Sequence, residues 1–197
     1  IWDASTGGEV MRLSEGHAYL ASSAILFDEG RRLMTAAVDN SARIWDVASG
    51  AELFRLEKTG RAAAVAVAPD QESIVTGGAS GIIQVWNART GERTRNIQAE
   101  RGHTQEVTAL AFADEGRYLL SGDARGRLCV WDFGTGALKH RFDSHTRKIN
   151  QIVVFPDGKT AATASSDNTV GQWDLAAGTE LKSRILKHPD AVLALQL

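Results

Sequence analysis

Histidine, hydroxyl and carboxylate residues, which cooperate in many hydrolases, recur together in this sequence. His17 is followed by Thr35 and Asp39, and His145 has a threonine and an aspartate at the same distances. A nucleophilic hydroxyl, an imidazole base and an orienting carboxylate are the groups that acyl transfer needs. The trio is repeated, however, and no oxyanion-hole or nucleophile context accompanies it. The sequence therefore predicts a structural role for the trio, and we expect no catalytic residue.

The remaining residues of chemical interest predict neither a metal site nor a cofactor site. His103, His145 and His188 lie 42 and 43 residues apart, and no histidine or cysteine spacing is that of a zinc site. Gly158-Lys159-Thr160 resembles the end of a phosphate-binding loop, but the glycine required five residues earlier is Val153. We therefore expect no metal and no cofactor.

The composition is that of an ordinary soluble globular chain. Of its 197 residues 43% are apolar, and 22 basic against 24 acidic residues give a net charge of −2. This balance gives no electrostatic reason to expect nucleic acid or an anionic membrane as a partner. The longest purely apolar run, 62–68, is too short to span a bilayer, so no membrane insertion is expected. The single cysteine, Cys129, is expected to be a small buried hydrophobe and favours a cytoplasmic, intracellular location.

Tryptophan residues supply the repeat that must position these side chains. Successive tryptophans are separated by 43, 41, 45 and 42 residues. Each is followed at once by Asp or Asn, and a glycine stands five residues after each. A fixed period of this length indicates a repeat architecture. The tryptophans are Trp2, Trp45, Trp86, Trp131 and Trp173.

Each period reads as four short strands. The first is an almost unbroken apolar run such as 107–112, which we expect to be buried on both faces. The second is small and apolar, the third ends at the tryptophan, and the fourth is charged, as in 52–57. Charges suit a sheet edge that must not pair with another chain. This gradient places the first strand innermost and the fourth outermost, and such units arranged radially form an all-β propeller.

The Trp-Asp pairs, together with Gly16-His17 and Gly102-His103, resemble the WD-repeat family over the whole chain. The resemblance implies a β-propeller of four-stranded antiparallel blades. Residues 1–14 and 191–197 are then expected to be partial blades, and the chain to be an open arc of a larger, seven-bladed ring whose remainder lies in the same parent protein. The four complete blades run roughly over 18–57, 61–101, 105–143 and 147–187.

In the WD-repeat family a histidine, a Ser/Thr, an Asp and the tryptophan of one blade form a hydrogen-bonded chain. Such a chain satisfies the buried imidazole and indole groups and fixes their packing. The resemblance implies complete chains in the first and fourth blades. They consist of His17, Thr35, Asp39 and Trp45, and of His145, Thr163, Asp167 and Trp173.

The two middle blades depart from this pattern. The third blade keeps His103, Ser121 and Trp131 but has Arg125 at the aspartate position. The second blade has Lys58 and Ser80 in place of the histidine and the aspartate, and keeps only Thr76 and Trp86. We therefore expect an incomplete network in both middle blades.

By the same resemblance, partners dock on the face built from the loops that lead into the first strands and the turns that join second to third strands. Arginine and tyrosine are over-represented among interface anchors. Because these loops also hold Glu100, Glu106 and Asp123, the sequence does not predict a basic face. The candidate partner-binding residues are Tyr19, Arg61, Gln105, Arg125, Arg147 and Lys148.

The sequence thus predicts a non-catalytic scaffold that binds a partner protein or peptide through propeller loops, as part of a larger protein or assembly. One alternative is an enzyme that uses the central channel of the propeller, which would need clustered acids or metal ligands. The other is a nucleic-acid-associated subunit of an assembly, which the net charge of −2 opposes.

Overall fold

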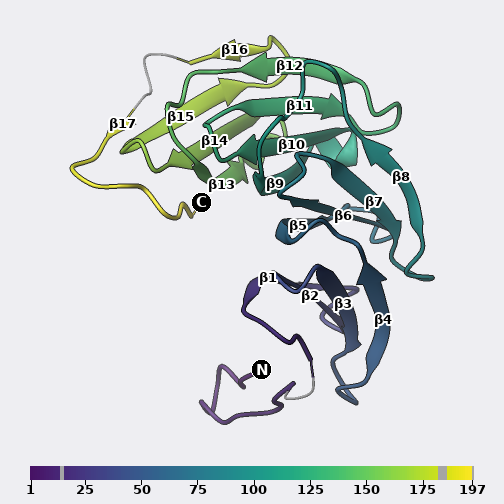
Figure 1. Ribbon diagram of the computed structural model, residues 1–197. Helices are drawn as coiled ribbons and strands as arrows, with labels where there is room; N and C mark the ends of the chain where they lie inside the picture. The colour runs from purple at the N-terminus through teal and green to yellow at the C-terminus, as the bar shows by residue number, and fades with distance from the viewer. Residues whose placement is uncertain (14–15, 182–185, 197) are drawn as a thin grey trace.

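The computed structural model describes residues 1–13, 16–181 and 186–196. In this part of the chain the strands form four separate antiparallel sheets, each built from consecutive strands. Figure 1 shows the sheets fanned around a common centre, with the arc open between the two ends of the chain. The predicted fold class, an all-β propeller of four-stranded antiparallel blades that is not closed into a ring, is confirmed.

In every sheet the first strand lies nearest the centre of the arc, and the fourth lies on the outside (Figure 1). The first strands are β1 (Ala21–Phe27), β5 (Ala62–Val67), β9 (Val107–Ala113) and β13 (Ile149–Val154). The second strands are β2 (Arg32–Ala37), β6 (Ser73–Gly78), β10 (Tyr118–Asp123) and β14 (Thr160–Ser165).

The third strands carry the tryptophans near their carboxyl ends. They are β3 (Ser41–Asp46), β7 (Ile83–Asn87), β11 (Leu128–Asp132) and β15 (Thr169–Asp174). The fourth strands are β4 (Glu52–Glu57), β8 (Arg93–Ile97) and β12 (Leu138–Phe142). In the last sheet two short segments, β16 (Thr179–Glu180) and β17 (Leu186–Lys187), both pair with β15. A 3₁₀ turn, η1 (Asp114–Gly116), lies between β9 and β10. Among the described residues no helix is long and apolar enough to cross a membrane.

The hydrophobic core lies between the sheets. Each of the three buried clusters combines residues from two consecutive sheets. In β10, Leu119 packs in the cluster shared with the preceding sheet and its neighbour Leu120 in the cluster shared with the following sheet. Successive strand residues point to opposite faces, so a strand covered on both faces must be apolar throughout. This explains the continuous apolar runs in the sequence.

The first sheet departs from the predicted burial. β1 was expected to be buried on both faces, but only Phe27 is buried, the other residues are partly buried or exposed, and Leu26 is 56% exposed. The reason is that the described residues cover only one of its faces with a complete sheet, the one that begins with β5. The inner strand β5, which has a sheet on each side, is buried along most of its length.

The two ends of the chain only partly follow the predicted partial blades. Residues 1–13 form a hairpin held by a bridge between Trp2 and Glu9, and its turn has the same hydrogen bond as the complete sheets, from Gly7 N–H to the Asp3 carbonyl. Residues 191–196 were expected to form a first strand but form none, although Val192 N–H donates to the Ser165 carbonyl. No second strand is present among the described residues to pair with them. Residues 14, 182–185 and 197, which the predicted blades include, lie outside the described residues.

Side-chain hydrogen bonds connect neighbouring sheets both near the centre of the arc and farther from it. Near the centre, Ser22 Oγ donates to the Ala62 carbonyl of the next sheet (2.7 Å), and Thr108 Oγ1 donates to the Ile149 carbonyl at the same distance. Farther out, Arg32 Nη1 donates to the Ala88 carbonyl of the second sheet (2.9 Å). These bonds satisfy carbonyl groups that face the gap between sheets.

Glycine residues in the second strands pack against β-branched residues at the start of the next first strand, and this contact sets the distance between neighbouring sheets. A Cβ atom on Gly122 would lie 2.7 Å from Cγ2 of Ile149, the residue that begins the next first strand. A Cβ on Gly77 would lie 2.5 Å from Cγ1 of Val107, which begins β9. Side chains do not reach such distances without a shift of the backbone, so glycine at these positions permits the close approach of the sheets.

We expect Gly122→Ala to lower the free energy of unfolding by about 1–3 kcal/mol, because the added methyl overpacks the contact with Ile149. Urea denaturation monitored by tryptophan fluorescence measures this change. Gly134→Ala is the matched control, since a Cβ there comes no closer than 3.6 Å to another atom, and it should be nearly neutral. In the double variant with Ile149→Ala the two losses should be clearly less than additive. Full additivity would contradict the proposed contact.

Candidate functional site

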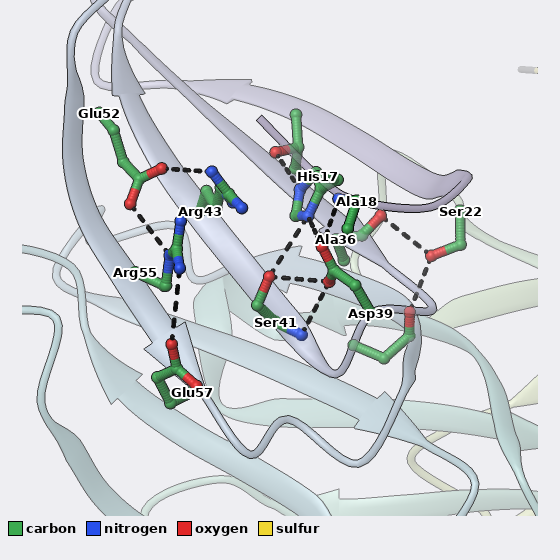
Figure 2. Close-up of polar contacts among 12 residues, drawn as sticks. His17, Ala18, Ser22, Ala36, Asp39, Ser41, Arg43, Glu52, Arg55 and Glu57 are labelled. Atoms are coloured by element: carbon green, nitrogen blue, oxygen red, sulfur yellow. Dashed lines mark hydrogen bonds and ion pairs between the residues drawn. The ribbon is translucent and has the colours of Figure 1, made fainter. Parts of the chain in front are cut away.

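The structure brings the predicted polar residues of the first and fourth sheets together. In the first sheet, Trp45 Nε1 donates to Thr35 Oγ1 (2.8 Å), which lies 2.8 Å from His17 Nε2. His17 Nδ1 lies 2.9 Å from Asp39 Oδ2, as the close-up in Figure 2 shows for the labelled His17 and Asp39. In the fourth sheet the corresponding distances are 2.9, 2.7 and 3.0 Å. They join Trp173 to Thr163, Thr163 to His145 and His145 to Asp167.

The third sheet has a complete chain, contrary to the expectation of an incomplete one. Trp131 Nε1 donates to Ser121 Oγ (2.7 Å), Ser121 Oγ lies 2.6 Å from His103 Nε2, and His103 Nδ1 lies 2.9 Å from Asp123 Oδ2. The carboxylate therefore comes from the last residue of β10 and not from the turn position occupied by Arg125. The second strand of every sheet ends eight residues before the tryptophan, and only β10 has an aspartate at that position. A count back to the turn position therefore misses this carboxylate.

The second sheet keeps only half of the chain. Trp86 Nε1 donates to Thr76 Oγ1 (3.0 Å), and within the described part of the chain no imidazole bonds to this threonine. At the histidine position the side chain of Lys58 is exposed, and its backbone carbonyl accepts a hydrogen bond from Gln84 Nε2 (3.0 Å). Of the two middle sheets that were expected to have an incomplete network, only the second has one.

The trio of Ser121, His103 and Asp123 has the connectivity of a catalytic triad, but its environment differs. Ser121 is completely buried, and its oxygen already accepts the indole N–H of Trp131. The remaining protons fit one arrangement: the hydroxyl donates to His103 Nε2, and Nδ1–H donates to Asp123. Ser121 is closed off from solvent, and its hydroxyl is engaged with both Trp131 and His103, so this trio orders the blade.

The aspartates of these chains are strongly stabilised in their ionised form. Burial would raise the pKa of Asp39, but hydrogen bonds from Ser41 and His17 outweigh it and lower the pKa to about 2. Burial opposes ionisation of Asp167 as well, yet bonds from Thr169 and the Thr146 N–H lower its pKa to about 2. Hydrogen bonds to a carboxylate favour its charged form.

The loops at this end of the sheets form one continuous rim. We define the rim as the loops that lead into the first strands and the turns that join second to third strands. Asn40 Oδ1, in the turn of the first sheet, accepts hydrogen bonds from the N–H groups of Gly60 (2.8 Å) and Arg61 (3.1 Å) in the next loop. Each turn of one sheet therefore lies against the incoming loop of the following sheet. The rim comprises residues 16–20, 38–40, 58–61, 79–82, 98–106, 124–127, 143–148, 166–168 and 188–190.

The same contact recurs along the arc. A Cβ on Gly81 would lie 3.0 Å from the carbonyl oxygens of His103 and Gln105. At the third sheet, a Cβ on Gly126 would lie 2.5 Å from the His145 carbonyl oxygen and 2.6 Å from that of Arg147. The predicted partner-binding residues are thus spread along one surface and do not converge on a single point.

Five of the six predicted partner-binding residues are exposed on this rim. Tyr19 is 70% exposed, and Gln105 is partly buried. The exposed residues are Tyr19, Arg61, Arg125, Arg147 and Lys148.

A shallow, open hollow of about 520 Å³ lies where the rim passes from the first to the second sheet. Tyr19 and Val38 come from the first sheet, and Arg61 and Ala79 from the second. Val38 is 39% exposed, so the hollow presents apolar surface to solvent. The sequence indicated Tyr19 and Arg61 here but not Val38 or Ala79, because small apolar turn residues carry no chemical signal. The lining is completed by Asp39, Asn40, Gly60 and Ser80.

The charge on the rim differs from the sequence-based expectation. Asp123 was counted among the acidic groups that would balance the cations, but it is 1% exposed and bound to His103. Asp39 and Asp167 are likewise turned inward to their histidines. The exposed charge of the rim is therefore more positive than the composition of its loops suggests.

Two further expectations concern metal binding and the cysteine. Within residues 1–13, 16–181 and 186–196, no three or more His, Cys, Asp and Glu side chains form a group that could hold a metal ion. Cys129 is completely buried, and burial raises the pKa of its thiol to about 12, so the reactive thiolate is disfavoured.

Comparison with known proteins gives the same repeat. The sequence profile described as "WD domain, G-beta repeat" matches residues 55–87, 94–132 and 136–174, more than half of the chain. The U5 small nuclear ribonucleoprotein 40 kDa protein of Pongo abelii is 32% identical over 87% of this chain and 50% of its own length. WD repeat-containing protein SL1-17 of Schistosoma mansoni is 28% identical over 83% of this chain and 54% of its own.

A plant protein, cell division cycle 20.1, cofactor of APC complex, of Arabidopsis thaliana, is 27% identical over 93% of this chain and 42% of its own length. The chain thus spans about half the length of these relatives.

We expect Thr163→Val to destabilise the protein more than Thr76→Val, by about 1–3 kcal/mol. Both threonines are completely buried, and valine preserves their shape. Loss of the Thr163 hydroxyl leaves both Trp173 Nε1 and His145 Nε2 unpaired, whereas loss of the Thr76 hydroxyl leaves only Trp86 Nε1 unpaired. Urea denaturation of the two variants measures the difference, and equal losses would show that the imidazole bond adds nothing.

The low pKa values of Asp39 and Asp167 predict a specific acid sensitivity. Because these values are about 2, below the ordinary aspartate value of about 3.9, the stabilisation is complete above about pH 4 and is lost as the pH falls towards 2. Asp39→Asn should flatten the fall in unfolding free energy over this range. Glu115→Gln, at an exposed carboxylate, is the control and should leave the slope unchanged. An unchanged slope in Asp39→Asn would contradict this assignment.

Proposed function

Because the chain belongs to the WD-repeat family, we propose that it is a non-catalytic interaction platform that binds a partner protein or peptide through its rim. The buried polar chains hold the rim loops in place, and the exposed side chains between them make the contacts. This is a function of surface shape and charge, and it requires no reacting group.

The observation that carries the proposal is the hollow formed by Tyr19, Val38, Arg61 and Ala79. It combines a 70% exposed aromatic ring, small apolar surface and a guanidinium group at a junction of two sheets. Tyrosine and arginine with adjacent apolar surface are the features of binding hot spots. The hollow is large enough to receive one or two side chains of a partner.

The central channel supports this proposal over an enzymatic one. The space of about 380 Å³ between the first strands is lined mainly by Ala, Ser, Thr, Asn, Gln and aliphatic residues, with Lys148 at one side. The hydroxyls of Ser22 and Thr108 donate to backbone carbonyls and so serve the packing of the sheets. The lining offers no carboxylate or imidazole to act as general acid or base.

The names of two relatives are those of components of assemblies, a small nuclear ribonucleoprotein and a cofactor of a complex. We extend this kind of role to the present chain and propose that it serves within a larger protein or assembly. An intracellular location fits its single, buried cysteine.

Selection from a phage-displayed library of random dodecapeptides tests the proposed function without a known partner. We expect the selected peptides to bind the protein, and Tyr19→Ala to weaken that binding at least about tenfold because the aromatic anchor is lost. Fluorescence anisotropy with the synthesised peptides measures the affinities.

Arg89→Ala, in a turn between third and fourth strands, is the matched control and should bind as the wild type does. A selection that yields no binding peptide, or peptides whose binding is insensitive to Tyr19, would contradict the proposed platform.

A further inference from the structure

The charges of the rim specify what the partner carries. We propose that the rim binds an acidic peptide segment, with one apolar side chain in the hollow beside Tyr19 and with carboxylates directed to Arg61, Arg125, Arg147 and Lys148. This inference rests on the proposed function and adds the chemistry of the partner. It follows from the way in which arginines are used at the two ends of the sheets.

At the end of the sheets opposite the rim, arginines on the turns are neutralised within the protein. Arg31 lies 2.8 Å from an Asp28 carboxylate oxygen, Arg89 lies 3.3 Å from Glu72, and Arg117 lies 3.7 Å from Asp114. These are exposed pairs of modest strength, but they leave each guanidinium with an acidic neighbour.

On the rim Arg127 is paired with Asp143 (2.9 Å), but the other described arginines there have no such neighbour. Among the described residues Arg61, Arg125 and Arg147 take part in no ion pair, and neither do the rim lysines Lys58 and Lys148. All five are exposed. A guanidinium group whose N–H donors have no carboxylate partner within the protein is suited to bind carboxylates of another molecule.

The rim has few outward carboxylates of its own that could neutralise these cations. Asp39, Asp123 and Asp167 are held by histidines and backbone N–H groups below the surface. Of the other described rim carboxylates, Asp143 pairs with Arg127 and Arg141, and Glu106 is partly buried. Glu100 is exposed, and Asp190 is exposed near the C-terminal end of the arc. The stretch from the hollow to Lys148 therefore has an excess of unpaired positive charge.

The path between these cations is continuous. The hollow includes Arg61, and the next turn, at Gly81, lies against the loop that contains Gln105. Arg125 directly precedes Gly126, whose Cα faces the carbonyl oxygen of Arg147. An extended peptide of about twelve residues, roughly 40 Å long, can follow such a surface across several loops.

The same features favour a peptide over single-stranded nucleic acid. Sequence-independent binding of a nucleic acid strand uses several aromatic rings on which successive bases stack. Tyr19 is the one exposed aromatic side chain on the described rim. It lies beside Val38 and Ala79, which suit an aliphatic side chain better than a phosphate backbone.

The library selection described above, now scored for charge, tests this inference. We expect the selected dodecapeptides to be enriched in Asp and Glu around one apolar residue. Replacement of their Glu residues by Gln should weaken binding at least about tenfold at low salt, and less at high salt because the charges are screened.

Matched variants locate the effect on the rim. Arg125→Gln combined with Arg147→Gln should abolish the advantage of the acidic peptide over its Gln version. Arg89→Gln combined with Arg117→Gln removes two arginines from the opposite end and should leave that advantage intact. Thermal melting of each double variant, with unchanged cooperativity, ensures that binding is compared between folded proteins.

Three outcomes would overturn the inference. Selected peptides that lack acidic residues but still depend on Tyr19 would leave the platform standing and refute its acidic specificity. A selection that yields no peptide would refute the platform itself. An oligothymidylate twelve-mer that competes more strongly than the acidic peptide, with the same dependence on Arg125 and Arg147, would assign the rim to nucleic acid.

Discussion

Each sheet of this chain has two apolar faces, and only the adjacent sheets can cover them. Leu119 and Leu120, neighbours in one strand, pack in two different interfaces, and glycine at position 122 lets the next strand approach to within contact of the backbone. The radial arrangement follows from this need, because a four-stranded unit has no other way to bury both sides. The position of the rim follows in turn, since stacking the sheets places every turn against the loop of its neighbour.

Much of the fold can be predicted from local patterns in the sequence. The tryptophan spacing and the gradient from apolar to charged strands depend on residues within one repeat, so they indicate the strands and their order from the centre outward. The burial of β1 could not be predicted in this way, because it depends on what covers each face and not on the strand itself. The segment 191–196 shows the same limit: its apolar character suits an inner strand, but a strand also requires a partner to pair with.

The hydrogen-bonded chains could be predicted in the sheets where the aspartate stands at the usual distance from the tryptophan. His17 and His145 meet their aspartates at the expected offsets, whereas His103 meets Asp123, two residues before the position given by the tryptophan count. The cause is the residue at the last position of the second strand, which is Asp123 in β10 but alanine, glycine or serine in the other sheets. The correction also changes the surface, because a carboxylate assumed to face solvent is turned inward. The electrostatic character of the rim is therefore set by the internal histidines as much as by the composition of the loops.

The location of Asp123 has a consequence for how such a repeat can diversify. In the first and fourth sheets the turn aspartate is tied to its histidine, and a change there disturbs the interior. In the third sheet Asp123, the last residue of the strand, binds the histidine instead. Position 125 therefore does not have to be an aspartate, and it carries an exposed arginine. A blade with two ways to meet one internal requirement has a spare surface position. Recognition can drift there without loss of folding, so specificity and stability can evolve separately within one repeat.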